Sequence, residues 1–200
     1  MLIWKAMTTL QVLKYSDYKV MPWKNGLGMT AQIDIFPKNT EFPPNSSDES
    51  FLWRVSSASV QNNNPFSQFP GCDRYLAVYQ GQGLRLNEKD LRPTQILQFR
   101  GEDPIQGDLI HGPVLDIGVI YRREKVHATM SFVQASPGQA LELTLTHKTH
   151  YIFCARGKFR CQEMKVSAKE TLIINKACDL QVIAEGNEDL QLYLIQLSLR

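Results

Sequence analysis

Two short segments combine residue types that could bind an anion. In WRVSSA, which begins at Trp53, the side chains of Arg54 and Ser56 fall on one face of an expected strand, because alternate residues of a strand point to the same side. In DIGVIYR, Asp116 and Arg122 share a face for the same reason. A guanidinium holds a carboxylate through two parallel hydrogen bonds, so these faces favour a small anionic ligand. Both faces could instead point to solvent, as is usual on one side of an antiparallel sheet.

Two further segments have the composition of ligand-binding loops. WKNGLG (23–28) offers an indole, an ammonium and an amide beside two glycines, which let the backbone approach a ligand closely. NPFSQFPG (64–71) is aromatic and rich in proline, unlike a simple solvated connection. A small β-barrel with a polar interior would bring such segments to one pocket.

Other kinds of chemistry have little support. His147 and His150 would lie on opposite faces of a strand, so we expect surface histidines near a hairpin and neither a metal nor another cofactor. Dinucleotide, phosphate-loop and G-x-S-x-G motifs are absent from the sequence. Cys72 stands beside Arg74, but a lone cysteine near an arginine is usually inert. The four cysteines have no tight pairing pattern, which predicts free thiols in a reducing cytoplasm.

The elements that would position these residues are strands. Short runs rich in β-branched and aromatic residues are separated by Gly, Pro, Asn or Asp, and no apolar stripe of helical spacing lasts three turns. Strands are expected at 31–36, 51–60, 74–81, 116–122, 128–135, 140–146, 151–156, 171–175, 180–185 and 190–199. This pattern predicts an all-β sandwich or barrel.

A faint internal repeat favours two similar halves. YLAVYQG (75–81) and YIFCARG (151–157) each begin with Tyr, continue with apolar residues and end at a turn glycine. We therefore expect a half at 1–125 and a half at 126–200, with a hinge near 122–125. The two halves would form a single compact unit.

Composition limits the partners. The net charge of +2 arises from 22 basic and 20 acidic side chains scattered along the chain, which argues against nucleic acid. The sequence has no run of about 18 apolar residues and no signal-peptide core, so we expect no membrane span and a cytoplasmic location. The oligomeric state stays open in the sequence, and a homodimer is one of the states that it allows.

Four motifs resemble the HutD/Ves family of bacterial proteins. They are MPWKNGLGMT (21–30), FLWRVSSASV (51–60), NPFSQFPGCDR (64–74) and HGPVLDIGVIYRR (111–123), in the order and spacing of the family. The resemblance implies a bicupin-like fold of two β-barrel halves and an association with bacterial histidine utilisation and stress responses. No reaction is attached to the family, and it lacks the metal-binding histidines of cupins.

The sequence also departs from the family pattern. Leu27 replaces a glycine, Gln32 stands where the family has Glu, and Gly118 stands where it has Asn. An uncharged Gln32 cannot serve as a general acid or base, which weakens an enzymatic interpretation.

Motifs and resemblance together define the candidate ligand-binding residues. They are Trp23, Lys24, Asn25, Thr30, Gln32, Arg54, Ser56, Phe66, Ser67, Phe69, Asp73, Arg74, Asp116 and Arg122. The favoured hypothesis is a metal-free binder of a small anionic metabolite that modulates histidine catabolism. The alternatives are an isomerase or hydrolase with Asp116 or Asp73 as its base, and a protein-interaction module with an exposed aromatic patch.

Overall fold

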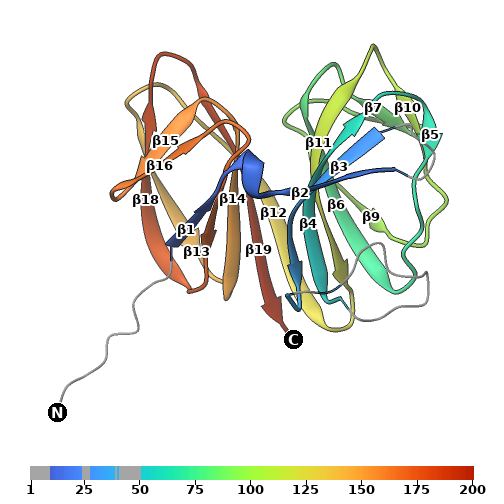
Figure 1. Ribbon diagram of the computed structural model, residues 1–200, viewed down its shortest axis with the longest axis horizontal. Helices are drawn as coiled ribbons and strands as arrows, with labels where there is room; N and C mark the ends of the chain where they lie inside the picture. Colours follow the sequence, from blue (N-terminus) through green and yellow to red (C-terminus); the bar gives the residue numbers. More distant parts are fainter. Residues whose placement is uncertain (1–9, 24–27, 39, 41–50) are drawn as a thin grey trace. The chain divides into compact units, whose positions relative to one another are not determined.

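A computed structural model describes residues 10–23, 28–38, 40 and 51–200 of the chain. The described residues form strands and a single 3-10 turn, so the all-β prediction is confirmed (Figure 1). Each of the ten expected strands overlaps a strand of the structure. None of the described segments forms a helix long and apolar enough to cross a membrane.

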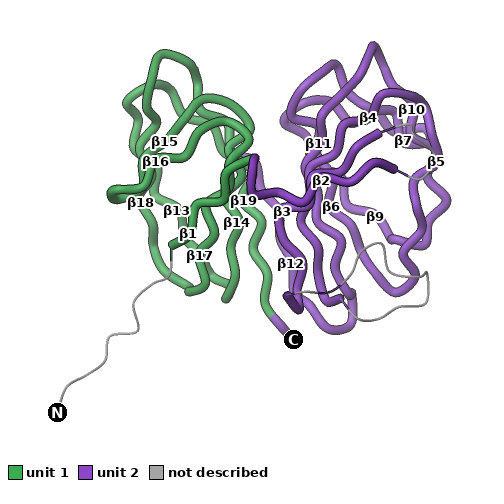
Figure 2. Tube along the Cα trace, in the orientation of Figure 1, with its two compact units in different colours: residues 1–15, 133–198 green, residues 16–132, 199–200 purple. Residues whose placement is uncertain are grey.

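The chain divides into two compact units (Figure 2). The N-terminal unit comprises residues 16–132 and 199–200, and the C-terminal unit comprises residues 133–198 with the first fifteen residues. These units differ from the expected halves in two ways. Strand β1 (Leu10–Leu13) pairs with β17 (Thr171–Ile174) and so belongs to the C-terminal unit. The expected hinge at 122–125 is a tight turn inside the N-terminal unit, closed by the Lys125 N–H donating to the Arg122 carbonyl at 3.1 Å.

The N-terminal unit contains two antiparallel sheets. The six-stranded sheet has the order β2 (Lys19–Pro22), β3 (Gly28–Phe36), β4 (Trp53–Val60), β11 (Val114–Arg122), β6 (Cys72–Gln80) and β9 (Leu97–Arg100). The four-stranded sheet has the order β5 (Asn64–Pro65), β10 (Gln106–Leu109), β7 (Leu84–Leu86) and β8 (Lys89–Leu91). Apolar side chains from both sheets, such as Val78 and Leu86, form one buried cluster that joins the sheets. A turn at Tyr15–Asp17 (η1) precedes β2.

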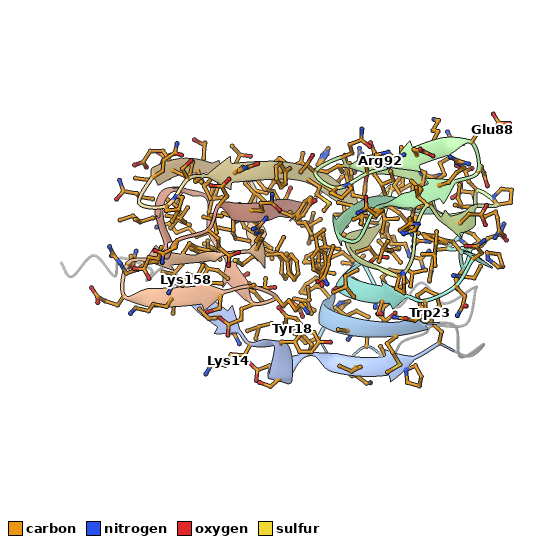
Figure 3. All side chains as sticks on the ribbon, turned by 90° about the horizontal axis from the view of Figure 1, so that it is seen from above. Lys14, Tyr18, Trp23, Glu88, Arg92 and Lys158 are labelled. Carbon is orange, nitrogen blue, oxygen red and sulfur yellow. The ribbon has the colours of Figure 1, made fainter. Side chains whose placement is uncertain are left out.

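The C-terminal unit is also built from antiparallel sheets. One sheet contains β1, β17, β14 (Thr149–Arg156) and β19 (Leu190–Leu199) in that order. Strand β12 (Val126–Ala135) begins in the N-terminal unit and ends in the C-terminal unit. The other sheet has the order β13 (Ala140–Leu145), β18 (Cys178–Glu185), β15 (Lys158–Cys161) and β16 (Met164–Ser167). Its interior is a large apolar cluster that includes Ile152, Phe159 and Leu192, and side chains fill the space between the strands (Figure 3).

The two segments of the internal repeat form strands, and the chain continues after both strands with the same local structure. YLAVYQG lies in β6 and YIFCARG lies in β14, and each strand is followed by a glycine with positive φ, Gly81 at 101° and Gly157 at 76°. A Cβ on Gly81 would lie 2.7 Å from the Pro113 carbonyl oxygen, and one on Gly157 would lie 3.0 Å from that of Asp189. Only glycine tolerates both the conformation and the close approach. A two-stranded hairpin follows each glycine, β7–β8 and β15–β16.

Candidate functional site

Strand register brings the predicted arginines into one row. Ile120 of β11 pairs with Arg54 of β4 on one side and with Arg74 of β6 on the other. Paired residues of neighbouring strands point to the same side of a sheet. Arg54 and Arg74 therefore lie on the same face of the six-stranded sheet, separated by one strand.

The two neighbouring rows of this face carry the remaining polar groups. Gly118 pairs with Ser56, and Asp116 pairs with Ala58. Strand β3 extends the rows, because Gln32 lies opposite Ser56 and Thr30 lies opposite Ala58. The register thus gathers Thr30, Gln32, Arg54, Ser56, Arg74 and Asp116, which we call the polar face.

Apolar clusters border the polar face. Leu76 and Val78, which share the face through β6, belong to the cluster that joins the two sheets. Ile35 and Ile120, which flank Arg54, belong to a second cluster with Phe51 and Cys72. Charged groups beside such surfaces are partly removed from water, so their interactions with each other and with a ligand are strengthened.

Arg54 is almost fully enclosed, with 5% of its surface exposed. Its Nε donates to Gln32 Oε1 at 3.1 Å. Burial, together with the nearby charge of Arg74, lowers the pKa of Arg54 to about 9, while Asp116 opposes the shift. The guanidinium is therefore a buried cation that a negative charge would stabilise.

Arg74 is held among three aromatic rings. Its guanidinium carbon lies 5.1 Å from the ring centres of Phe66 and Phe99 and 5.7 Å from that of Phe69. One N–H donates to the Ser67 carbonyl oxygen at 3.2 Å. An arginine has five N–H donors, and the others have no hydrogen-bond partner among the residues that the structure describes. Burial lowers the pKa of Arg74 to about 10, with Asp116 acting in the opposite direction.

Asp116 is the carboxyl group of the polar face. It is 5% exposed, and its Oδ1 accepts a hydrogen bond from the Ala58 N–H at 3.0 Å. The second oxygen has no partner in the described part of the chain. Burial raises the pKa of Asp116 to about 7, although the Ala58 N–H, Arg74 and Arg54 each favour the charged form. The group therefore changes protonation state near neutral pH.

The centre of the polar face lacks bulky side chains. Ser56 and Gly118 are half-buried, and the Ser56 hydroxyl has no partner among the described residues. A Cβ on Gly118 would lie 2.7 Å from the Tyr75 carbonyl oxygen, so a side chain there would force β6 and β11 apart. The close approach of the two strands therefore favours glycine at position 118.

The WKNGLG segment contacts the polar face through Trp23. The Trp23 indole N–H donates to Thr30 Oγ1 at 2.7 Å, and Trp23, labelled in Figure 3, directly follows the last residue of β2. A Cβ on Gly28 would lie 2.5 Å from the Ser59 carbonyl oxygen and 2.9 Å from the indole, which explains the glycine. The candidates Lys24 and Asn25 lie outside the described residues, as does Leu27.

Arg122 holds backbone beside the polar face. It shares a side of β11 with Asp116, but its Nε donates to the Phe51 carbonyl at 3.3 Å and a terminal N–H donates to the Pro70 carbonyl at 3.0 Å. These bonds fix the end of the NPFSQFPG loop. Within that loop, Ser67 contacts Arg74 through its carbonyl and not through its hydroxyl, while Phe66 and Phe69 contact it through their rings.

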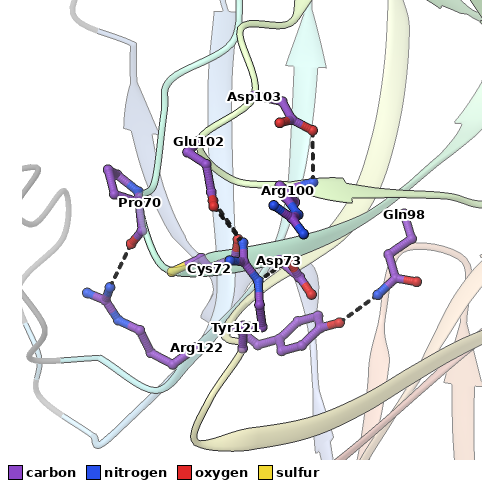
Figure 4. A network of polar contacts seen from close by, with 10 residues as sticks. Pro70, Cys72, Asp73, Gln98, Arg100, Glu102, Asp103, Tyr121 and Arg122 are labelled. Atoms are coloured by element: carbon purple, nitrogen blue, oxygen red, sulfur yellow. Dashed lines mark hydrogen bonds and ion pairs between the residues drawn. The ribbon is translucent and has the colours of Figure 1, made fainter.

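Asp73 does not face the same side as Arg74. It pairs with Tyr121 across the strands, and its carboxylate accepts from Arg123 Nε at 2.7 Å. Arg123 also binds Glu102 at 2.8 Å and the Cys72 carbonyl at 2.8 Å (Figure 4). Asp73 therefore belongs to an ion-pair network on the opposite face, and the arrangement separates it from Arg54 and Asp116.

Sequence reasoning also missed two features. Phe99, the third ring around Arg74, lies in the short strand β9, which no motif marks. His150 was expected at the surface, but it is 0% exposed, with Nδ1 3.1 Å from the Ile174 carbonyl and Nε2 without a partner. Alternation with Ile152 and Cys154, which belong to the core, was the signal for its inward direction.

The described residues contain no cluster of three or more His, Cys, Asp or Glu side chains that could hold a metal ion. The four cysteines are free, and three of them are buried.

Two curated relatives are similar to more than half of the chain. The chain is 34% identical over 131 residues to an uncharacterised 21.2 kDa protein from the hutC 3′ region of Pseudomonas putida, covering 63% of this chain and 65% of the relative. It is 30% identical over 125 residues to protein Ves of Citrobacter koseri, covering 58% and 61%. These alignments span less than two thirds of the relatives' own lengths.

Solved structures resemble nearly the whole chain. HutD from Pseudomonas fluorescens has a TM-score of 0.76 at 29% identity, covering 96% of this chain and 100% of the other. A cupin 2 conserved barrel protein from Leptotrichia buccalis has a TM-score of 0.53 at 11% identity, covering 97% and 99%, and shows a cupin-like fold alone. The profile of the HutD family matches residues 15–192, and the chain therefore belongs to the HutD/Ves family.

Proposed function

We propose that the protein binds a small anionic ligand, without a metal, at the polar face. The observation that carries this proposal is the row in which Arg54 and Arg74 flank Ile120, with unpartnered N–H donors on Arg74. Arg54 is buried and Arg74 is half-buried, both act on the carboxyl group of Asp116, and a bound carboxylate would be attracted to both guanidinium groups. Ser56 would add a hydroxyl whose hydrogen-bonding capacity is unused in the described structure.

We further propose that binding modulates amino-acid catabolism, and histidine breakdown in particular. The similar protein of Pseudomonas putida is named for the hutC 3′ region, and the similar HutD of Pseudomonas fluorescens is described in a formate condition. Formate is a small carboxylate of the kind that two arginines favour. The free thiols agree with action in the cytoplasm.

The fold that we propose for this function is bicupin-like, with a β-barrel in each half. The matching glycines and hairpins after β6 and β14 support it, since they repeat one local design in both units. The polar groups lie in the N-terminal unit, and apolar residues fill the C-terminal unit.

Isothermal titration of the full chain tests binding. The probes are sodium formate, acetate and the carboxylic acids formed during histidine breakdown. We expect saturable heat with the wild type and affinity at least about tenfold weaker in Arg54→Ala and Arg74→Ala, because a hydrogen bond to a charged group contributes roughly 1.5–3 kcal/mol. Arg156→Ala, which removes an exposed arginine of the C-terminal unit, is the matched control. Absence of heat with every probe, or equal affinities in all variants, contradicts the proposal.

Catalysis is a second candidate, favoured by one observation. A buried carboxyl with a pKa of about 7 is suited to general acid–base chemistry. Turnover of a bound acid, followed by NMR, would have to disappear in Asp116→Asn while the variant stays folded. Asp73, the other residue considered as a base, accepts a hydrogen bond from Arg123 and lies on the opposite face of the sheet.

A further inference from the structure

Few charged or polar side chains lie on the same face of the sheet as Asp116. Arg54 approaches from β4 and Arg74 from β6, and these are the charges that act on it. Strand β3 contributes the uncharged Thr30 and Gln32, and the acidic Asp34 and Asp73 pair across to residues of the opposite face. Arg74 and Asp116 influence each other through their charges, and no ion pair within 4 Å joins these two described residues.

An anion on the arginines would change the surroundings of this carboxyl. Without a ligand, the two guanidinium groups favour the charged form of Asp116. A bound carboxylate would neutralise part of that support and would add a like charge nearby, and both effects favour the protonated form. The oxygen of Asp116 that lacks a partner could then carry the proton and donate a hydrogen bond to the anion.

We propose that the anion binds together with one proton, which Asp116 takes up from hydronium or a buffer acid in the solvent. The bond from that acid to its proton breaks, an O–H bond forms on the Asp116 carboxylate, the acid leaves as water or buffer base, and the ligand stays anionic. The protein would respond to acidity as well as to ligand concentration. This inference rests on the proposed function, because it needs an anion on Arg54 and Arg74.

The sign of the effect follows from linkage. Affinity is highest where Asp116 is already protonated, and it weakens as the pH rises through the ligand-free pKa of about 7. Each unit by which the bound-state pKa exceeds the free one gives about a tenfold loss at high pH. Arg54 is the other group whose protonation could follow binding, since its pKa is lowered to about 9. A variant at Asp116 distinguishes proton uptake by Asp116 from proton uptake by Arg54.

The test is titration with sodium formate in phosphate and in Tris buffer, at several values between about pH 6 and pH 8.5. Buffers of different ionisation enthalpy reveal the protons exchanged. We expect uptake of up to about half a proton at pH 7, a larger uptake between the ligand-free and the ligand-bound pKa, and at least about tenfold weaker binding at the alkaline end. Asp116→Asn keeps an oxygen for the Ala58 N–H, and it should bind with a flat pH profile and little proton uptake. Asp179→Asn, at an exposed position of the C-terminal unit, should behave as the wild type.

The outcomes separate the two proposals. Formate binding without proton uptake, or with a pH profile that Asp116→Asn leaves unchanged, overturns the inference but retains the binding function. No binding of any carboxylate at any pH overturns both. If Asp116→Asn does not fold, the carboxyl carbon of Asp116 can be titrated by NMR in the wild type. Its midpoint should move to higher pH when formate is added, and an unmoved midpoint contradicts the inference.

Discussion

Arg54 and Arg74 occupy one row of the six-stranded sheet, with Ile120 of β11 between them. They are far apart in the sequence, and only the pairing of β4 and β6 with the same central strand brings them to one face. Their environments differ, because Arg54 is bonded to Gln32 whereas Arg74 is stacked among phenyl rings.

Replacing Arg74 with lysine should weaken carboxylate binding by about tenfold to a hundredfold, although the charge is retained. An ammonium lacks the planar fork of donors that grips both oxygens and stacks on Phe66 and Phe99. Titration calorimetry measures the loss. Arg85→Lys, which alters an exposed arginine paired with Asp90, should leave affinity unchanged. Equal affinity in wild type and Arg74→Lys would mean that charge alone is recognised.

Replacing Gly118 with alanine should destabilise the protein by about 1–3 kcal/mol, because the new Cβ would lie 2.7 Å from the Tyr75 carbonyl. Denaturant unfolding measures the change. Ser56→Ala, on the facing strand, removes a hydroxyl that has no partner among the described residues and should change stability by less than about 0.5 kcal/mol. A Gly118→Ala variant as stable as the wild type would show that β6 and β11 adjust freely.

Asp116→Asn should stabilise the ligand-free protein above about pH 7. In the folded protein the pKa of Asp116 is about 7, which exceeds the ordinary value of 3.8. The contribution of its protonated form to the free energy of unfolding is therefore complete below pH 3.8 and is lost as the pH rises through the folded pKa. An amide has no charge to bury, and the gain should be roughly 1–3 kcal/mol. Unfolding free energies at about pH 8 and pH 5 would check it. A larger gain at the acidic value would contradict the assigned direction.

Acid should destabilise the C-terminal unit through His150. Burial lowers the pKa of His150 below the ordinary value of 6.5, so the unfolded chain takes up the proton more readily as the pH falls below 6.5. The loss amounts to about 1.4 kcal/mol for each unit of difference between the two pKa values. His150→Gln should flatten the decline of unfolding free energy between about pH 7 and pH 5, whereas the exposed control His127→Gln should not. Identical slopes in both variants would exclude His150 as the source.

The sequence predicted correctly which residues share one face of a strand. It did not predict which residues of other strands contact them. Alternation placed Arg54 with Ser56, and Asp116 with Arg122, because these relations are local to one strand. The same rule separates Asp73 from Arg74, yet the family motif grouped them, since a motif records proximity along the chain and not direction. The ring of Phe99 reaches Arg74 through the pairing of β9 with β6, a contact that no local pattern encodes. The buried position of His150 depends on where β14 begins, and strand boundaries are the least readable feature of a sequence.

The pairing of β1 with β17 has a consequence for biosynthesis. The N-terminal strand leaves the ribosome long before its partner, so it must remain unpaired while the intervening residues are made. An expression fragment that starts after β1 would expose the edge of β17, which invites aggregation. Supplying the missing strand as a separate peptide should rescue such a fragment, so the protein offers a natural split-complementation pair.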